Sequence, residues 1–209
     1  VSDGSLLEEL IEVLDERGKS GVKILFCFDN VGGRLIKRTT INRMKRIPNL
    51  QLTSYEPLGI NINPAINYRD HRKITVIDGD IAYVGGDNLA DEYIHRKKRF
   101  GYWRDNSLKI TGEAVYSFVV LFAEMWYMST KEMLVVEDYK GTNIDVSKSL
   151  IMPFGDGPTN KLNPTYELFK CLIGISKKTL YISTPYFIID KDFINLFCLA
   201  ARSEVEVKI

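Results

Sequence analysis

Histidine is scarce in this chain, with two residues among 209. Its unperturbed pKa lies between pH 5 and 8, so imidazole chemistry within the chain depends on His71 or His95. The three cysteines, Cys27, Cys171 and Cys198, match neither a disulfide framework nor a metal-ligand spacing. We expect them to be buried thiols in a protein of a reducing compartment.

The chain also lacks a marked net charge and a long apolar run. Its charge of +1 neither favours nor excludes an acidic partner. The most apolar stretch, residues 114–128, is interrupted by Glu124 and is shorter than the about 20 residues that a membrane-spanning helix needs. No signal peptide is recognisable. We therefore expect this chain to be soluble and long enough for one or two domains with a core.

Apolar patterns predict helices alternating with strands. Ser5 and Glu8 have the spacing of a capping box before the first helix. The continuous apolar character of residues 22–28 predicts a strand buried on both faces by helices. Residues 61–68 are predicted to form a loop. The predicted helices lie at about 5–18, 35–45, 113–128, 164–175 and 191–201, and the predicted strands at 22–28, 50–55, 72–78, 81–85, 106–111, 150–154, 179–184 and 205–209.

A weak internal repeat indicates two similar halves. One helix leads into Val22-Lys23-Ile24, and a later helix leads into Val207-Lys208-Ile209. A strand is predicted before the later helix but not before the first one. We interpret residues 1–130 as a first half lacking its first strand, 131–148 as a connection, and 149–209 as the beginning of a second half. The alternative is that a three-residue match arose by chance.

The stretch RDHRKITVIDG, residues 69–79, combines a strand pattern with chemically useful side chains. Strand alternation places His71 and Lys73 on one face and Asp78 on the other. Asp78 also begins an Asp-Gly pair, which is a strong hairpin signal. The sequence therefore leaves two roles open for Asp78, that of a turn residue and that of a catalytic carboxylate.

The predicted hairpin would bring an asparagine to the same face. A two-residue loop at 78–79 pairs His71 with Gly86, and a loop at 79–80 pairs it with Asn88. Both registers place Asn88 on the face of His71 and Lys73, and the glycines leave a hollow there. Neutral imidazole is a nucleophile or base, lysine supplies positive charge and asparagine supplies donors. The predicted site suits a phosphate.

The pattern H-x-K-x4-D followed by G-G-x-N resembles the signature of the phospholipase D superfamily. The matching residues are His71, Lys73, Asp78, Gly85, Gly86 and Asn88. Further pieces resemble the bacterial cardiolipin synthase branch: NYRDHRK (67–73), GGDNLADEY (85–93), YWRD (102–105), DGP (156–158) and TPYFIID (184–190). The resemblance extends over essentially the whole chain.

This resemblance implies an α/β fold with a mixed sheet flanked by helices, present as an N-terminal half plus the start of a second, similar half. It implies phosphodiester exchange through a phosphohistidine, with no metal or other cofactor and with two facing copies of the motif. His71 would be the nucleophile, or the acid in the opposite motif. Lys73, Gly86 and Asn88 would bind phosphate, and Asp105 would orient the imidazole.

The chain departs from the family pattern because it contains no second motif. Lys97 follows His95 at the right spacing, but Tyr102 stands where the aspartate should be. We therefore expect His95 to be a surface residue and the second motif to lie in a longer parent chain. The present chain would then carry half of an active site and be inactive in isolation.

The resemblance implies that the parent protein joins two phosphatidylglycerol molecules into cardiolipin and releases glycerol. Its partners would be phosphatidylglycerol, anionic membrane lipid and the second half of the parent chain, without nucleic acid. Its location would be the bacterial cell membrane. Two alternatives remain: another phosphodiesterase of the superfamily, acting as a phospholipase or nuclease, and a non-catalytic phosphate-binding module.

Three other features have both a functional and a structural interpretation. The basic run 95–99 with Arg104 either contacts anionic lipid or is a solvated loop, and its aromatic neighbours Phe100, Tyr102 and Trp103 fit a core. Asp29 either lines the site or caps the next turn. The remaining acidic residues fit turn and helix-cap roles better than a metal site: Asp78, Asp80, Asp87, Asp91 and Glu92.

Overall fold

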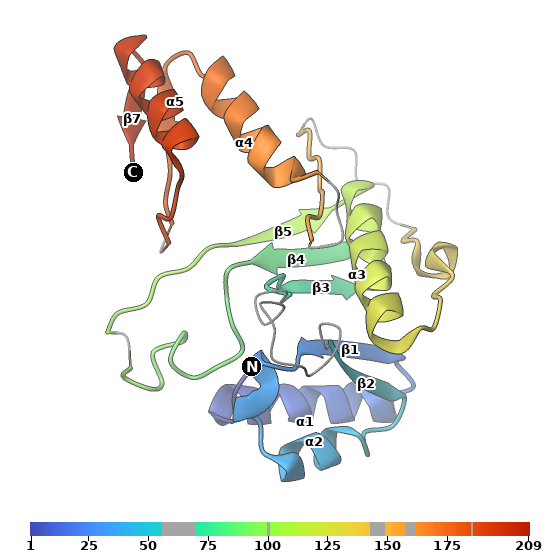
Figure 1. Ribbon diagram of the computed structural model, residues 1–209. Coiled ribbons are helices and arrows are strands. Elements are labelled where there is room, and N and C mark those ends of the chain that lie inside the picture. Colours follow the sequence, from blue (N-terminus) through green and yellow to red (C-terminus); the bar gives the residue numbers. More distant parts are fainter. Residues whose placement is uncertain (56–69, 100, 143–148, 158–161, 185) are drawn as a thin grey trace. The chain divides into compact units, whose positions relative to one another are not determined.

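The computed structural model describes residues 1–55, 70–99, 101–142, 149–157, 162–184 and 186–209 (Figure 1). The chain divides into two compact units, Val1–Gly155 and Asp156–Ile209, and each is described by itself. Both combine helices with small sheets, which confirms the predicted α/β class. The organisation into two halves joined by residues 131–148 stays a prediction.

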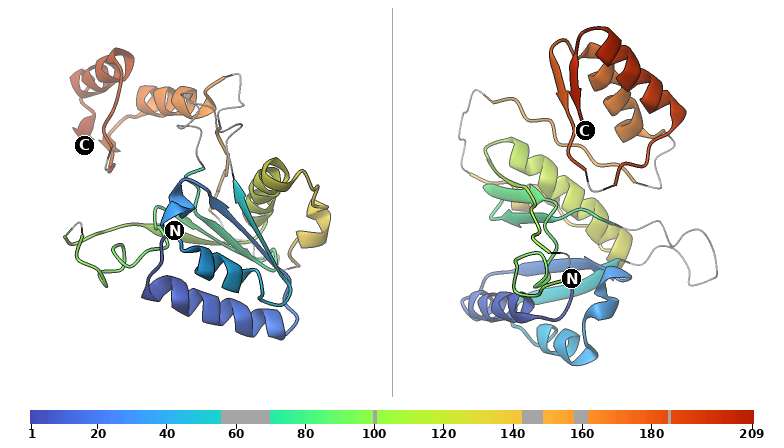
Figure 2. Two further views of the ribbon diagram at one scale, coloured as in Figure 1. Left: turned by 60° about the horizontal axis from the view of Figure 1, so that its bottom comes forward. Right: turned by 90° about the vertical axis from the view of Figure 1, so that its left-hand side faces the viewer.

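The first unit begins with a parallel pair of strands covered by helices. Its elements are α1 (Ser5–Lys19), β1 (Ile24–Asp29), the 3-10 helix η1 (Gly32–Leu35), α2 (Arg38–Met44) and β2 (Leu50–Tyr55). Strands β1 and β2 are parallel, with Ile24 opposite Leu50 and Asp29 opposite Tyr55. Figure 2 shows α1 and α2 together on one face of this pair. The predicted basic helix at 35–45 is shorter than expected, because residues 32–35 form a separate 3-10 turn.

The two faces of β1 pack against different helices because its side chains alternate. Phe26 and Phe28 pack toward α1 and α2, and Cys27 Sγ lies 3.5 Å from Ser129 Oγ on the opposite face. The buried residues of the first face are Leu7, Ile11, Ile36, Met44 and Ile47. Strand β1 is half-buried along its length, so the predicted burial on both faces is incomplete.

An antiparallel three-stranded sheet forms the second part of this unit. It consists of β3 (Ile74–Ile77), β4 (Ile81–Gly85) and β5 (Ser107–Thr111), in that order. Helix α3 (Ala114–Thr130) packs against strands of both sheets, and a 3-10 turn, η3 (Val136–Tyr139), follows. The core under α3 contains Ala82, Ile110, Val115 and Phe118. Along α3 the buried residues include Val115, Phe118, Val119 and Trp126, which form the face that packs into the core.

The second unit contains α4 (Pro164–Ile175), β6 (Thr179–Tyr181), α5 (Lys191–Arg202) and β7 (Glu206–Lys208). Strands β6 and β7 are parallel and are connected through α5. Its core consists of Ile173, Phe197, Ala200 and Val205. Asp190 begins α5 by accepting a hydrogen bond from the Phe193 N–H, at 3.0 Å, which is an ordinary helix cap.

Several predicted details are wrong. Residues 150–154 form no strand, and Leu150 is 98% exposed, because no strand of the described residues pairs with this segment. Cys171 and Cys198 are exposed rather than buried, because they lie on the outer faces of short helices. Burial does raise the pKa of the Cys27 thiol. The predicted loop at 61–68 lies outside the described residues.

Two findings concern the helices. Helix α1 begins at Ser5, but neither Ser5 nor Glu8 caps it, so the predicted capping box is absent. Within the described part of the chain, no helix is long and apolar enough to span a membrane.

Candidate active site

His71 and Lys73 lie in residues 70–73, the segment that leads directly into β3. The predicted strand at 72–78 is therefore shorter than expected and begins at Ile74. The His71 side chain is exposed and that of Lys73 is half-buried. Lys73 Nζ donates a hydrogen bond to the His71 carbonyl oxygen at 2.6 Å. The ammonium group thus lies beside the backbone that presents the imidazole.

The residues on either side of His71 are bonded to each other. The Asp70 carboxylate accepts hydrogen bonds from the Arg72 N–H at 2.9 Å, from Nε at 3.0 Å and from Nη2 at 3.3 Å. Both side chains are mostly buried, at 28% exposure for Arg72 and 15% for Asp70. This brace fixes the backbone around His71. Sequence reasoning missed it, although an acid and a base flanking the histidine were a usable signal.

The β3–β4 hairpin has a different register from either predicted one. Asp78 and Gly79 have φ values of 53° and 71°, as a type I′ turn requires, and the Asp80 N–H donates to the Ile77 carbonyl at 3.0 Å. Asp80 then adds one residue before Ile81 pairs with Ile77. Both two-residue registers are therefore wrong, because the loop between the paired residues has three residues.

The one-residue shift changes which side chains oppose each other. Lys73 lies opposite Gly85, whose N–H donates to the Lys73 carbonyl at 3.4 Å, and continuing this register places Asp87 opposite His71. Strand β4 ends at Gly85, so strand parity does not fix the direction of Asn88. The half-buried Asn88 lies in the loop that follows. Its position beside His71 and Lys73 stays a prediction.

Asp78 occupies the hairpin turn. Its side chain is exposed and its backbone is left-handed, a conformation that aspartate tolerates better than most residues. Gly79 in the same turn lies against the backbone of Tyr139 to Gly141, where an added Cβ would collide. The turn interpretation of Asp78 is confirmed. Among the described residues, no hydrogen bond joins the Asp78 carboxylate to another predicted site residue, so its catalytic role stays a prediction.

Gly86 and Asp105 lie in direct contact. A Cβ built on Gly86 would lie 2.9 Å from Cγ and 3.0 Å from Oδ2 of Asp105, and the Gly86 N–H donates to the Asn106 carbonyl at 3.2 Å. A glycine is required here because the carboxyl group occupies the space that a side chain would need. The structure thus brings together two predicted site residues that are 19 positions apart.

Asp105 is oriented by its own neighbours. Trp103 Nε1 donates to Oδ2 at 3.2 Å, and the Asn106 N–H donates to Oδ1 at 2.9 Å. The Trp103 ring packs edge-on against Tyr93, with centroids 4.9 Å apart. Within the described residues no hydrogen bond joins Asp105 to the His71 imidazole. The predicted orienting role of Asp105 therefore stays a prediction.

His95 is exposed, as predicted. One of its ring nitrogens, Nε2, lies 2.7 Å from the Trp103 carbonyl oxygen, and its ring stacks on Tyr102 with centroids 4.6 Å apart. Tyr102 is 84% exposed, so the prediction that it belongs to the core is wrong. Trp103 is half-buried, and Phe100 lies outside the described residues.

Two arginines of the basic run make contacts inside the protein. Arg96 bonds to Glu9, and Arg99 bonds to Glu92 at 3.0 Å. Glu92 is 5% exposed and pairs with the half-exposed Arg99, so it forms an ion pair instead of the turn or cap that we predicted. Lipid contact by the rest of the run stays a prediction.

Asp91 caps α1 from a distant part of the sequence. Its carboxylate accepts hydrogen bonds from the Ser5 N–H and the Leu6 N–H, both at 2.9 Å. These bonds hold the pKa of Asp91 below its usual range. A cap role for Asp91 was predicted, but its partner was not, because no local pattern connects positions 5 and 91. Asp29 also has a cap role, since Oδ1 accepts from the Gly32 N–H at 2.6 Å.

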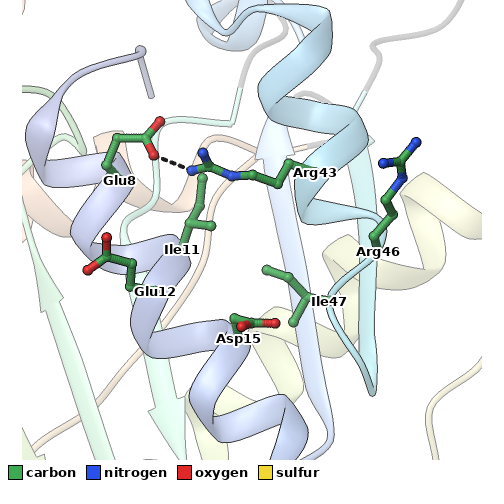
Figure 3. Close-up of a pocket in the computed structure, with 7 residues that line it drawn as sticks. All are labelled: Glu8, Ile11, Glu12, Asp15, Arg43, Arg46 and Ile47. Carbon is green, nitrogen blue, oxygen red and sulfur yellow. Dashed lines mark hydrogen bonds and ion pairs between the residues drawn. The ribbon is translucent and has the colours of Figure 1, made fainter.

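No cluster of three or more histidine, cysteine, aspartate or glutamate side chains in the described residues could hold a metal ion. A groove of about 350 Å³ lies between α1 and α2 (Figure 3), and the Glu8–Arg43 ion pair crosses it. None of its lining residues belongs to the signature, so the groove adds nothing to the phosphate site.

Comparison with known proteins identifies close relatives. No protein-family model matches the chain. The chain is 33% identical over 205 residues to a cardiolipin synthase of Geobacillus kaustophilus, a match that covers 97% of this chain and 41% of the relative. It is 34% identical over 213 positions to a cardiolipin synthase of Halalkalibacterium halodurans and to cardiolipin synthase 2 of Bacillus cereus, covering all of this chain and 42% and 41% of the relatives. The chain therefore spans about two fifths of the length of the curated relatives it matches.

Proposed function

Because this chain belongs to the phospholipase D superfamily, in the branch of the bacterial cardiolipin synthases, we propose that the protein carrying it is a phosphatidyltransferase. It joins two phosphatidylglycerol molecules into cardiolipin and releases glycerol. The contact of Gly86 with Asp105 carries this proposal best, because it unites the glycine segment of the signature with the carboxylate expected to orient a catalytic imidazole. The relatives' names support the lipid class of the substrate.

The first half of the reaction transfers the phosphatidyl group to the protein. An imidazole nitrogen of His71 attacks phosphorus, and the bond from phosphorus to the glycerol headgroup oxygen breaks. That oxygen takes a proton from the histidine of the second motif and leaves as glycerol. Lys73 places its positive charge beside the phosphate oxygens, Gly86 leaves room for them, and the Asn88 amide donates hydrogen bonds to them. Such donors act most strongly on the charge that develops in the transition state.

The second half regenerates the imidazole. The terminal hydroxyl of a second phosphatidylglycerol attacks phosphorus and gives its proton to the opposite histidine. The bond between nitrogen and phosphorus breaks, which yields cardiolipin and free His71. The two histidines exchange roles if His71 is the acid instead. Membrane localisation and the second motif of the longer protein belong to the same proposal.

His71 and His95, the two histidines of this chain, offer a matched test in the full-length protein. His71→Gln removes the proposed nucleophile, whereas His95→Gln changes the other histidine and keeps a polar side chain near Trp103. With vesicles of phosphatidylglycerol, the wild type and His95→Gln should form cardiolipin, and His71→Gln should not. Brief reaction with phosphate-labelled lipid, followed by rapid denaturation and peptide mapping, should place the label on the peptide that contains His71.

The outcomes separate the alternatives. Cardiolipin formation by His71→Gln at the wild-type rate contradicts the proposal. Release of phosphatidic acid without cardiolipin identifies a phospholipase, and cleavage of nucleic acid with no lipid product identifies a nuclease. Phosphate binding without any adduct or product identifies a non-catalytic module. Label on the opposite motif alone assigns the acid role to His71.

A further inference from the structure

The loop that carries Asn88 is bonded at three points to helix α1 or to the residues that precede it. Its first tie lies directly after Asn88, where the Leu89 carbonyl oxygen accepts a hydrogen bond from the Ser2 N–H at 3.0 Å. The second tie is the Asp91 carboxylate, which accepts from the N–H groups of Ser5 and Leu6 at 2.9 Å each. Gly4 is close enough that an added Cβ would lie 2.6 Å from Asp91 Cγ.

Arg96 provides the third tie, farther along the same loop. Its guanidinium donates to Ser5 Oγ at 3.0 Å and to the Glu9 carboxylate. The N–H groups of Arg96 and Lys97 both donate to the Asp91 carbonyl, at 2.9 Å and 3.2 Å. The backbones of Asp91 and Arg96 are therefore bonded to each other, and the side chains of both residues reach the start of α1. Together with the Ser2 bond, these contacts attach the loop to the start of α1. We call the side-chain part of this attachment the latch and define it as Asp91, Arg96, Ser5 and Glu9.

The latch ends on a rigid element. Helix α1 is anchored in the core through Leu7 and Ile11, which are 1% and 4% exposed. By contrast, the loop from Gly86 to Arg99 contains no helix or strand, and its internal backbone bonds are those of isolated turns, such as the bond from the Ala90 N–H to the Asn88 carbonyl at 3.0 Å. A loop without regular structure keeps one conformation only where contacts to a fixed element supply the constraint.

We propose that the latch of Asp91 and Arg96 on helix α1 positions Asn88 for phosphate binding. Asp91 and Arg96 are positioning residues that do not touch the substrate. The inference rests on the proposed function in one respect, the role of Asn88 as a phosphate ligand. It goes beyond that function because it assigns a catalytic purpose to the amino terminus of α1, which begins 66 positions before His71 and 83 positions before Asn88.

Neighbouring glutamates on α1 provide a matched pair of variants. Glu9 bonds to Arg96 of the latch, whereas Glu8 bonds to Arg43 of α2. Both glutamates are exposed, and each variant to glutamine removes one ion pair from the same helix. Glu9→Gln and Asp91→Ala should lower kcat for cardiolipin formation in the full-length protein, by about tenfold to a hundredfold for Asp91→Ala, as expected for a misplacement near 1 Å. Glu8→Gln should keep the wild-type kcat.

Rescue separates positioning from a general loss of stability. The double variant Glu9→Arg/Arg96→Glu reverses the ion pair, and it should recover activity that Arg96→Glu alone loses. Asp91→Asn keeps one acceptor oxygen and should lie between the wild type and Asp91→Ala. The melting temperature, measured in parallel, should fall similarly for Glu8→Gln and Glu9→Gln, while kcat should separate them. Equal kcat in these two variants would overturn the inference.

Hydrogen exchange gives a readout that does not depend on catalysis. In the full-length protein, amides of the peptide spanning residues 85–90 should exchange faster in Asp91→Ala and Glu9→Gln than in wild type, and at the wild-type rate in Glu8→Gln. Unchanged exchange in Asp91→Ala overturns the latch even if the protein is an active synthase. If exchange rises as expected but no variant or wild type forms cardiolipin or an adduct, the proposed function fails and the latch stands.

Discussion

The contact between Gly86 and Asp105 gives the sharpest prediction, for the variant Gly86→Ala. A methyl carbon at position 86 would lie 2.9 Å from Asp105 Cγ, whereas carbon atoms pack at about 3.5–4.0 Å. The carboxyl group or the loop must therefore move by about 0.6–1.1 Å. A shift of that size breaks at least one of the hydrogen bonds from Trp103 Nε1 and the Asn106 N–H, which are 3.2 Å and 2.9 Å long.

The expected consequences are a moderate loss of stability and a larger loss of activity. Overpacking of this kind costs about 1–3 kcal/mol of unfolding free energy, and a misplacement near 1 Å lowers kcat by up to about a hundredfold. The assay is cardiolipin formation by the full-length protein, with urea denaturation in parallel. Gly174→Ala is the control: it adds the same methyl group in α4, where an added Cβ meets nothing within 4 Å, so it should raise stability slightly and leave kcat unchanged.

A double-mutant cycle tests the stated cause. In an Asp105→Ala background the carboxyl group is gone, so the further change Gly86→Ala should cost clearly less stability than it does in the wild type. An equal cost in the two backgrounds would show that the methyl group collides with something else. Full activity of Gly86→Ala would refute the reasoning that this glycine exists to admit Asp105.

Three further predictions concern stability and the turn. The Asp91 pKa is lowered in the folded protein, so the stabilisation by its carboxylate should be complete above the unfolded pKa of about 3.9 and be lost as pH falls through the lower folded pKa. The difference in unfolding free energy between wild type and Asp91→Ala should therefore shrink over that acid range. A difference that stays constant would contradict the capping role of Asp91. Asp78→Ala should lower the unfolding free energy by about 1 kcal/mol, because the backbone at this position is left-handed. Asp78→Gly should keep both the stability and the kcat of the wild type. A loss of kcat in the stable glycine variant would show that the carboxylate is catalytic. Arg72→Ala should lower the unfolding free energy by about 1–2 kcal/mol, because it removes the mostly buried bonds to Asp70. The control Lys19→Ala removes an exposed ion pair on α1 and should cost about 0.3–0.5 kcal/mol. Equal losses would show that the Asp70–Arg72 pair stabilises the protein no more than an exposed ion pair does.

The elements that the sequence predicted best are those with a clear local pattern. Strands β2 and β4 and helix α4 begin and end where the apolar pattern and Pro164 predicted. The strand predicted at 150–154 is also apolar but is absent. A strand forms only where a neighbour accepts its hydrogen bonds, and that neighbour is not a property of the segment itself.

The register of the β3–β4 hairpin shows a second limit. The Asp-Gly pair correctly predicted the turn, but Asp80 adds a residue that no turn preference specified. Gly79 and Asp80 pack against the Tyr139–Gly141 backbone, a contact between segments about 60 positions apart. One extra residue exchanges the two faces of a strand, so the predicted convergence of His71 and Asn88 could not be derived from parity.

The sequence by itself determined which signature this chain carries, because spacing and residue type are local properties: His71, Lys73 and the glycine–asparagine segment stand at the spacings of the phospholipase D pattern. The tertiary structure decided how that signature is held. It placed Asp105 against Gly86, braced His71 between Asp70 and Arg72, and used Asp91 in place of a local cap for α1. Two of these three arrangements join residues far apart in the chain, and hydrogen bonds and close packing between them form only when the folded core fixes their distance.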